Sequence, residues 1–268
     1  TRKGINMSSP IMFEIKDQIG WLTLNRPQAF NAMDTDTMRG LSEIANQCSC
    51  DKTIRALVIT GSGDKAFSAG GDVPSFANDP ESVDRLLMDM TTYLHSAISR
   101  FARLHIPVIG AINGMTAGAG LGLMACCDLV IASDAARFTS AYTQIGFSPD
   151  GSTSYYLTRQ LGPRRAKEFF ITNRVLDAQT ALDWGLVNRV VPAEKLQEIT
   201  SELAYMLASG PTQAYGQVKS LVDSALSETL ESQMELEARS ITELSKTQDG
   251  QEGVKAFMEK RPAKFKGC

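Results

Sequence analysis

Two glycine-rich segments hold the residues of this sequence best suited to chemistry. One spans residues 66–72 (AFSAGGD), and the other spans residues 113–122 (NGMTAGAGLG). Small residues let a ligand approach the backbone closely, and a helix that begins in such a loop presents unpaired N–H groups. Two loops of this kind, side by side, can direct two amides at one developing oxyanion, as on a thioester enolate or a tetrahedral species. Either loop alone is equally well explained as a tight turn, because a single glycine motif is a weak signal.

One carboxylate and two histidines are the candidates considered for acid–base or metal chemistry. Asp150 lies in residues 148–151 (SPDG), and the residue types alone favour a turn in which Asp150 caps the following helix. The two histidines, His95 and His105, have no carboxylate or cysteine at ligand spacing, so we predict no metal site. His95 follows Tyr93 and Leu94 in a helical pattern, where a histidine is more often packed or solvated than catalytic.

Other catalytic signatures are absent from the sequence. A dinucleotide fingerprint that began at Gly118 would need a third glycine at position 123, which is Leu123. No glycine-rich stretch ends in Gly-Lys-Ser/Thr, and no Gly-x-Ser-x-Gly elbow occurs. The sequence therefore predicts neither a Rossmann site, nor a phosphate loop, nor a serine hydrolase.

Composition narrows the class of protein further. The chain has 268 residues, 43% of them apolar, and a net charge of −3, which favours neither nucleic acid nor a membrane surface as a partner. The longest apolar stretch, residues 117–132, contains Asp128 and three glycines and is too short to span a bilayer. Five cysteines in no framework spacing, with Cys126 and Cys127 in an apolar run, predict buried thiols and a reducing, cytoplasmic setting.

The elements that position these loops follow an α/β pattern. We expect a hairpin of strands at residues 11–16 and 19–25, then a helix capped by Asp34 that ends near Cys48. Further strands at residues 56–60, 108–112 and 128–133 alternate with helices, including a long one near residues 81–104, which favours a mostly parallel sheet. The C-terminal part is helical, and its amphipathic helices near residues 212–225, 228–245 and 251–261 predict packing on a neighbour or on a partner subunit.

The two glycine loops, in this order, resemble those of the crotonase (enoyl-CoA hydratase/isomerase) superfamily. There the loops read A-F-S/C-A-G-x-D and N-G-x-x-x-G-G/A-G. The resemblance continues in N-R-P-x-x-x-N-A at residues 25–32, A-x-x-W-G-L-V at 181–187 and E-G-V-x-A-F-x-E-K-R at 252–261, so it covers nearly the whole chain. It implies a spiral of ββα units with two stacked sheets over residues 7–200, a helical C-terminal trimerisation region over residues 201–268, and a homotrimer or a dimer of trimers.

The resemblance also implies roles for single residues. The N–H groups of Gly71 and Ala119 would form the oxyanion hole, and Ala69, Gly70 and Asp72 would run beside the adenine and pantetheine arm of coenzyme A.

In this family an aromatic and a basic residue of the last helix reach the coenzyme A of a neighbouring subunit. The candidates are Phe257, Lys260 and Arg261, although a solvated basic face explains the two cations equally well.

Hydratases of the family hold a water between two glutamates, whose positions are occupied here by Gly122 and Tyr142. Glycine cannot transfer a proton, and a phenol, with an ordinary pKa of about 10, is a poor base at neutral pH. Efficient hydration is therefore not expected, and Tyr142 would line the acyl pocket through ring packing. Members with Asp or Glu after I-G-x-x-P use that carboxylate, which makes Asp150 the active acid.

Two subgroups share this carboxylate. In enoyl-CoA isomerases one base removes a proton from C2 and returns it at C4 through a dienolate, and the P-D-G spelling favours this reading. In 4-chlorobenzoyl-CoA dehalogenases the aspartate attacks the ring and a histidine activates water, and His95 falls at that histidine's position. The expected function is thus isomerisation of an enoyl-CoA, with a dehalogenase, a hydratase or a non-catalytic acyl-CoA-binding scaffold as alternatives. Coenzyme A enters as part of the substrate, and no metal or redox cofactor is expected.

Overall fold

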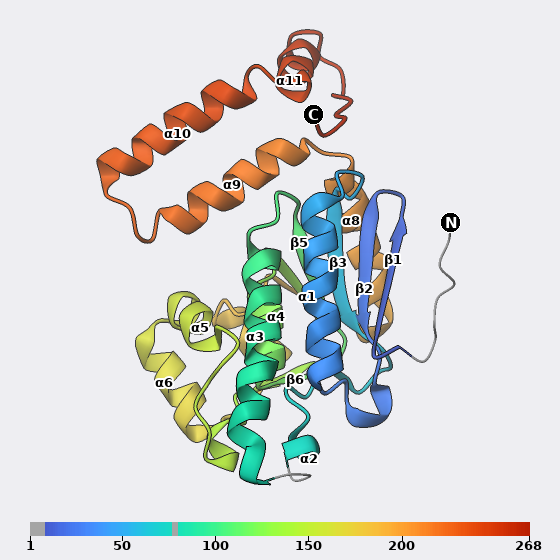
Figure 1. The fold of residues 1–268 in the computed structure, drawn as a ribbon. Coiled ribbons are helices and arrows are strands. Elements are labelled where there is room, and N and C mark those ends of the chain that lie inside the picture. The colour runs from blue at the N-terminus through green and yellow to red at the C-terminus, as the bar shows by residue number, and fades with distance from the viewer. Residues whose placement is uncertain (1–8, 77–79) are drawn as a thin grey trace.

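The computed structural model describes residues 9–76 and 80–268 as two sheets surrounded by helices (Figure 1). Thr1–Asn6, which we left outside the predicted fold, lie outside the described residues. The larger sheet has the strand order β1 (Ile11–Lys16), β2 (Ile19–Leu24), β3 (Ala56–Gly61), β5 (Val108–Ile112), β7 (Leu129–Ser133) and β10 (Arg189–Val191). The smaller sheet has the order β4 (Ala66–Ser68), β6 (Met115–Ala117), β8 (Arg137–Thr139) and β9 (Leu176–Asp177).

The helices follow the strands in a regular order. The first part of the chain contributes α1 (Thr35–Cys50), α2 (Val73–Phe76), α3 (Val83–Ala102) and α4 (Ala119–Ala125). The middle part contributes α5 (Thr153–Leu161), α6 (Pro163–Thr172), α7 (Ala178–Asp183) and α8 (Leu196–Ala208). The last part contributes α9 (Thr212–Ser224), α10 (Leu230–Leu244) and α11 (Gln248–Met258).

Successive turns of the chain place one strand in each sheet. β3, β5 and β7 lie in the larger sheet, and each is followed by a strand of the smaller one (β4, β6 and β8) before a helix begins. Within these turns the strand pairs are parallel, and only the β1–β2 and β8–β9 pairs are antiparallel. The predicted ββα spiral with two sheets is confirmed. The strands of the smaller sheet were not predicted, because two or three residues are too few for a periodic signal.

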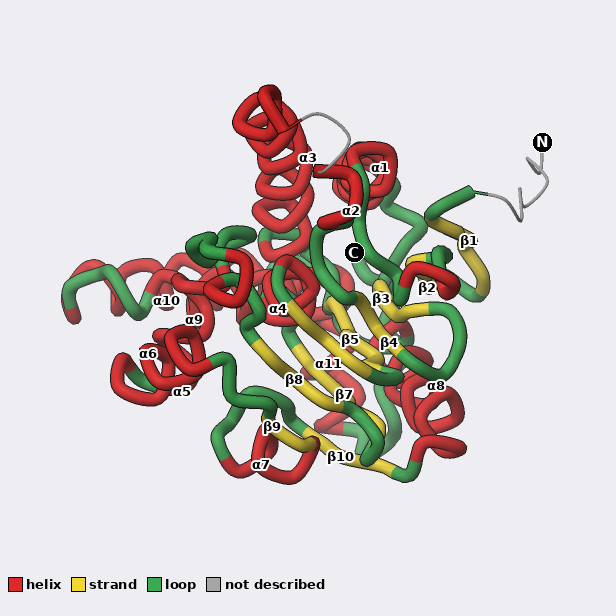
Figure 2. Tube along the Cα trace, turned by 90° about the horizontal axis from the view of Figure 1, so that it is seen from below, coloured by secondary structure: helices red, strands yellow, loops and turns green. Residues whose placement is uncertain are grey.

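Strand β3 explains why the central strands read as continuous apolar runs. Leu57 and Ile59 point into the core beneath α1 and α3, whereas Ala56 and Val58 point into a second core beneath α8. Alternate side chains of a strand face opposite sides, so burial of both faces requires every residue to be apolar. Viewed from below, the strands lie between α1 and α3 on one side and α8 on the other (Figure 2).

Local signals at the start of the chain are confirmed in detail. The hairpin turns at Asp17 and Gln18, both of which have positive φ, and the β1–β2 register pairs Lys16 with Ile19. Asp34 caps α1, since its Oδ1 accepts a hydrogen bond of 2.9 Å from the Thr37 amide. Cys126 and Cys127 are buried and free, as expected.

The C-terminal helices extend away from the two sheets (Figure 1). One ion pair ties α9 to the core, because Lys219 Nζ lies 2.7 Å from Asp128 Oδ2, which also accepts from the Val108 amide at 2.7 Å. The division into a core and a C-terminal assembly region remains a prediction, and its boundary at residue 200 falls inside α8. Among the described residues, no helix is long and apolar enough to cross a membrane.

Asn31 links the N-R-P-x-x-x-N-A segment to the connection between β3 and β4 through hydrogen bonds of its side chain. It is 1% exposed and has a φ of 54°. Its Nδ2 donates to Ser62 O (2.9 Å) and Ala66 O (2.8 Å), and its Oδ1 accepts from Arg26 N (3.0 Å). These bonds satisfy buried backbone groups on both sides of the β3–β4 connection, and β4 leads directly into the first glycine loop.

Replacing Asn31 by Ala should lower the free energy of unfolding by about 2–4 kcal/mol, because it removes three hydrogen bonds to backbone groups and places Ala at a positive φ. Asn46, which is exposed on α1, provides the control. Asn46→Ala should change stability by no more than about 0.5 kcal/mol. Urea denaturation of both variants measures the difference, and equal midpoints would contradict the assignment.

Candidate active site

A cavity of about 430 Å³ opens where the two glycine loops, α3 and the segment before α5 meet. Ala69 and Gly71 border it from the first loop, and Gly118 and Ala119 border it from the second. Tyr142 and Asp150 border it from the segment before α5. Much of the remaining lining is apolar and consists of Met38, Val73, Phe76, Leu87, Met90, Ile145 and Phe147.

Gly70 brings the two loops into backbone contact. Its φ is 94°, and a Cβ atom there would lie 2.9 Å from Ala117 O and 3.1 Å from Ala119 N. A side chain at this position would force the loops apart, and the positive φ would strain any other residue. The glycine therefore sets the spacing between the segments that carry the two candidate oxyanion donors.

Both candidate donors are free. Met33 N donates to Gly70 O (2.7 Å) and Asp72 N donates to Met33 O (3.0 Å), so this parallel bridge does not use the Gly71 N–H. Ala119 is the first residue of α4, where an amide has no partner within the helix. Neither N–H donates to another atom of the described residues. Two unpaired amides bordering one cavity fit the chemistry of an oxyanion hole.

The Asp72 carboxylate forms an ion pair within the chain. Its Oδ2 lies 2.8 Å from Arg26 Nη2, and its side chain is 14% exposed. Arg26 also donates to Ala32 O (2.8 Å) and lies 3.3 Å from Asp34 Oδ2. Neither Asp72 nor Gly70 is among the residues lining the cavity. The ion pair thus fastens the first glycine loop to the N-R-P segment.

The Asp150 side chain does not cap α5. The N-cap position is Ser152, which makes no side-chain capping bond, and the Thr153 amide and hydroxyl instead hold the Asp150 carbonyl at 3.0 and 2.7 Å. The expectation of an aspartate cap is therefore wrong. The carboxylate accepts from the Tyr142 phenol, with 2.6 Å between Oη and Oδ1.

Tyr142 borders the cavity, and the bond from its hydroxyl to Asp150 adds to the predicted ring packing. Burial, followed by the charge of Asp150 and this hydrogen bond, raises the pKa of Tyr142 well above its ordinary value of 10. The phenol therefore stays protonated at neutral pH and serves as a donor, not as a base.

Gly122 lies where the Asp150 turn crosses α4. A Cβ atom at Gly122 would lie 2.1 Å from Gly151 O and 3.0 Å from Gly151 C, so backbone fills the space that any side chain would need. The position that holds a glutamate in hydratases of the family has no room for one in this structure.

His95 supports the same turn from α3. Its Nε2 accepts a hydrogen bond of 3.1 Å from the Gly151 N–H, and the residue is not among those lining the cavity. The lone pair of His95 Nε2 is thus occupied by the backbone next to Asp150.

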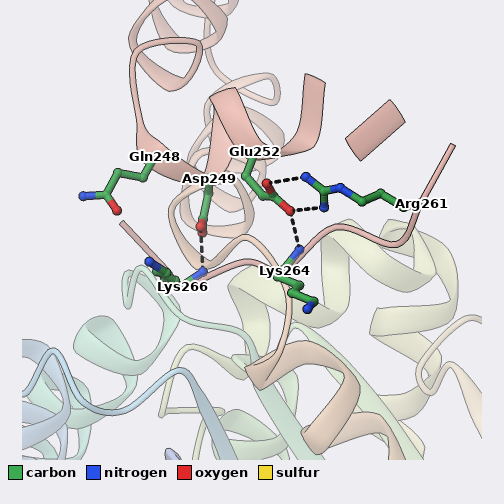
Figure 3. A pocket seen from close by; sticks show the side chains of 6 residues that line it. All are labelled: Gln248, Asp249, Glu252, Arg261, Lys264 and Lys266. Carbon is green, nitrogen blue, oxygen red and sulfur yellow. Dashed lines mark hydrogen bonds and ion pairs between the residues drawn. The ribbon is translucent and has the colours of Figure 1, made fainter. Parts of the chain in front are cut away.

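The C-terminal candidates lie elsewhere. Phe257, which is 83% exposed, and Lys260 lie at and beyond the end of α11, at the opposite end of the molecule from α2 (Figure 1). Arg261 is engaged within the chain by Glu252, with bonds of 2.6 and 2.9 Å, as Figure 3 shows. Together with the Lys264 amide, this bond lowers the pKa of Glu252 to about 2. The structure does not bring these residues to the cavity of their own chain.

The pocket in Figure 3 belongs to the C-terminal tail. It is lined by Gln248, Asp249, Glu252, Arg261, Lys264 and Lys266. Asp249 is 4% exposed and accepts from the amides of Lys266 (2.6 Å) and Gly267 (2.7 Å). The carboxylates of this pocket, Asp249 and Glu252, are therefore used in bonds that fix the C-terminal tail against α11.

Two contacts of the site escaped the sequence analysis. Nothing in the spacing of Tyr142 and Asp150 indicates that they meet, and nothing links His95 to Gly151. A tyrosine at a position that bears a carboxylate in relatives was the available signal, because it indicated a polar group aimed at the site.

Comparisons with known proteins agree with this geometry. The profile of the enoyl-CoA hydratase/isomerase family matches residues 14–268. The 1,2-epoxyphenylacetyl-CoA isomerase of Escherichia coli (strain K12) is 35% identical over 258 residues, covering 96% of this chain and 98% of that protein. The 4-chlorobenzoyl coenzyme A dehalogenase-2 of an Arthrobacter species is 36% identical over 237 residues, which cover 88% of this chain and 86% of that protein. The crystal structure of an enoyl-CoA hydratase from Bacillus anthracis superimposes with a TM-score of 0.91 at 30% identity. The superposition covers 97% of this chain and 100% of that one.

Gly122→Ala should lower the free energy of unfolding by about 1–3 kcal/mol, because the new methyl group meets the Gly151 backbone. Gly40→Ala on α1 is the matched control, since its Cβ would meet only the flexible end of Ile11 at 3.2 Å. We expect that control to be neutral or slightly stabilising. Chemical denaturation measures both, and a Gly122→Ala protein as stable as the parent would mean that the turn does not pack on α4.

Proposed function

The chain belongs to the enoyl-CoA hydratase/isomerase family, and we propose that within it this protein shifts a double bond in an unsaturated acyl-CoA. One observation carries the proposal. A single carboxylate, Asp150, borders a cavity that also presents the free amides of Gly71 and Ala119, with backbone filling the space at Gly122.

The proposed reaction needs one base and one oxyanion site. The thioester oxygen would accept hydrogen bonds from the Gly71 and Ala119 amides, which stabilise the charge as a proton leaves C2. Asp150 would take that proton and return it to C4 of the dienolate. One carboxylate suffices because the delocalised dienolate keeps both carbons on the same face within its reach. The scheme uses no metal or redox group, and coenzyme A is part of the substrate.

Hydration is the less favoured activity. It requires two carboxylates around one water, and here the first position is Gly122, packed on the Gly151 backbone, and the second is the protonated Tyr142. Water activation by a two-glutamate pair has no support in this arrangement.

Dehalogenation remains a second candidate because of the Arthrobacter relative and because His95 lies beside the Asp150 turn. The bond from the Gly151 N–H to His95 Nε2 counts against it, since a histidine that activates water needs that nitrogen free.

The substrate's acyl group should be apolar. Val73, Phe76, Ile145 and Phe147 border the cavity, and the rings of Phe76 and Phe147 lie 6.2 Å apart. Apolar lining favours a hydrocarbon acyl chain or ring over a polar one, because burying a polar group without a partner is costly.

We also propose a homotrimer, or a dimer of trimers, in a reducing, cytoplasmic setting. The five cysteines are free thiols, which supports the setting. Apolar side chains on the C-terminal helices are largely exposed in the single chain, which supports burial against other subunits. They are Val218, Val222, Leu226, Leu230, Met234, Leu236, Ile241, Val254, Phe257 and Met258.

Asp150→Asn should reduce kcat on a 3-enoyl-CoA by about 10²–10⁴-fold, because the amide cannot accept the C2 proton. Asp183→Asn on α7, an exposed acid outside the cavity, should retain wild-type turnover. Mass spectrometry of product formed in D₂O checks the mechanism through deuterium at C2 or C4. Wild-type turnover by Asp150→Asn would refute the assignment, and 4-hydroxybenzoyl-CoA made from 4-chlorobenzoyl-CoA would favour the dehalogenase instead.

The assembly has its own test. Sedimentation equilibrium should give a mass of three or six chains of 29.1 kDa. A monomer across micromolar concentrations would rule the trimer out and would leave the exposed apolar side chains unexplained.

A further inference from the structure

The carboxylate proposed as the base has one hydrogen-bond donor in the described part of the chain. Asp150 Oδ1 accepts from the Tyr142 hydroxyl at 2.6 Å, and Oδ2 accepts from no described residue. No lysine, arginine or histidine among those residues forms an ion pair with Asp150. The one fixed contact thus leaves the second oxygen free to exchange a proton with a substrate.

The geometry and state of the phenol match this arrangement. A distance of 2.6 Å is typical of a hydroxyl that donates to a charged carboxylate. The ring is largely buried, and burial together with the neighbouring charge keeps the phenol protonated. Tyr142 therefore offers a permanent donor and cannot compete with Asp150 for the proton of the substrate.

The surrounding contacts hold the Asp150 backbone but do not touch its carboxylate. Thr153 binds the Asp150 carbonyl through its amide and hydroxyl, and His95 accepts from the Gly151 N–H. The Tyr142 hydroxyl also lies 3.3 Å from the Asp150 carbonyl oxygen. The two shorter bonds from Thr153 and the bond to His95 remain when that hydroxyl is removed, so the backbone can stay in place. The side-chain torsions of Asp150 would then lose their one polar restraint.

We propose that Tyr142 is a positioning residue that orients the Asp150 carboxylate for proton abstraction through the hydroxyl-to-Oδ1 bond. This inference rests on the proposed isomerase function, and it assigns Tyr142 a polar task in addition to ring packing.

Tyr142→Phe tests the proposal because it removes the hydroxyl and keeps the ring. We expect kcat to fall about tenfold with little change in KM, because the carboxylate loses its fixed orientation while the apolar lining of the cavity stays intact. Tyr155→Phe is the matched control, since Tyr155 is half exposed on α5 and outside the cavity. It loses the same hydroxyl and should keep the wild-type kcat and KM. An unchanged kcat in Tyr142→Phe would overturn the proposal.

A second readout separates this inference from the isomerase assignment. The ¹³C signal of the Asp150 carboxyl, identified by its loss in Asp150→Asn, can be recorded without substrate. Its chemical shift should change in Tyr142→Phe, where the carboxylate loses its donor, and stay in place in Tyr155→Phe. A changed chemical shift in a protein that isomerises no enoyl-CoA would uphold the contact and reject the function. An unchanged chemical shift in an active isomerase would uphold the function and reject the contact.

Discussion

The site depends on backbone packed directly against backbone. At Gly70 the first loop touches the start of α4, and at Gly122 the same helix touches the turn that carries Asp150. A side chain at either position would separate segments that must converge on one cavity. The two free amides and the carboxylate are thus brought together by α4, a seven-residue helix with the second glycine loop at its start. The sheets and longer helices serve to hold that short helix in place.

The polar groups around this contact fall into two sets: some are bonded within the chain and hold the loops, and others are left available to a ligand. Asn31, Arg26 and Asp72 consume their hydrogen-bonding capacity within the chain and fasten the first loop. Asp150 keeps one oxygen uncommitted, and the Gly71 and Ala119 amides remain unpaired. Unsatisfied groups are costly in a protein interior, so their concentration beside one cavity is physically consistent with a ligand that completes them.

Much of this could be predicted from the sequence. Burial on both faces makes β3 a continuous apolar run, Asp34 is a local cap, and the glycine loops stand out by composition, so hairpin, helix and parallel strands were recognised. The strands of the smaller sheet were missed because they are two or three residues long. The pairing of Tyr142 with Asp150, and of His95 with Gly151, depends on how α3 and the turn pack together. For the same reason the residue types alone favoured Asp150 as a helix cap, whereas its carboxylate accepts from Tyr142 and its carbonyl accepts from Thr153.

The contact between Gly122 and Gly151 also limits how this protein can evolve. A glutamate at position 122 would collide with the backbone of the turn, so its carboxylate could take part in proton transfer only if the turn moved. Moving the turn first would displace Asp150 from the cavity that it borders. A carboxylate at position 122 therefore requires a joint change of α4 and of the turn.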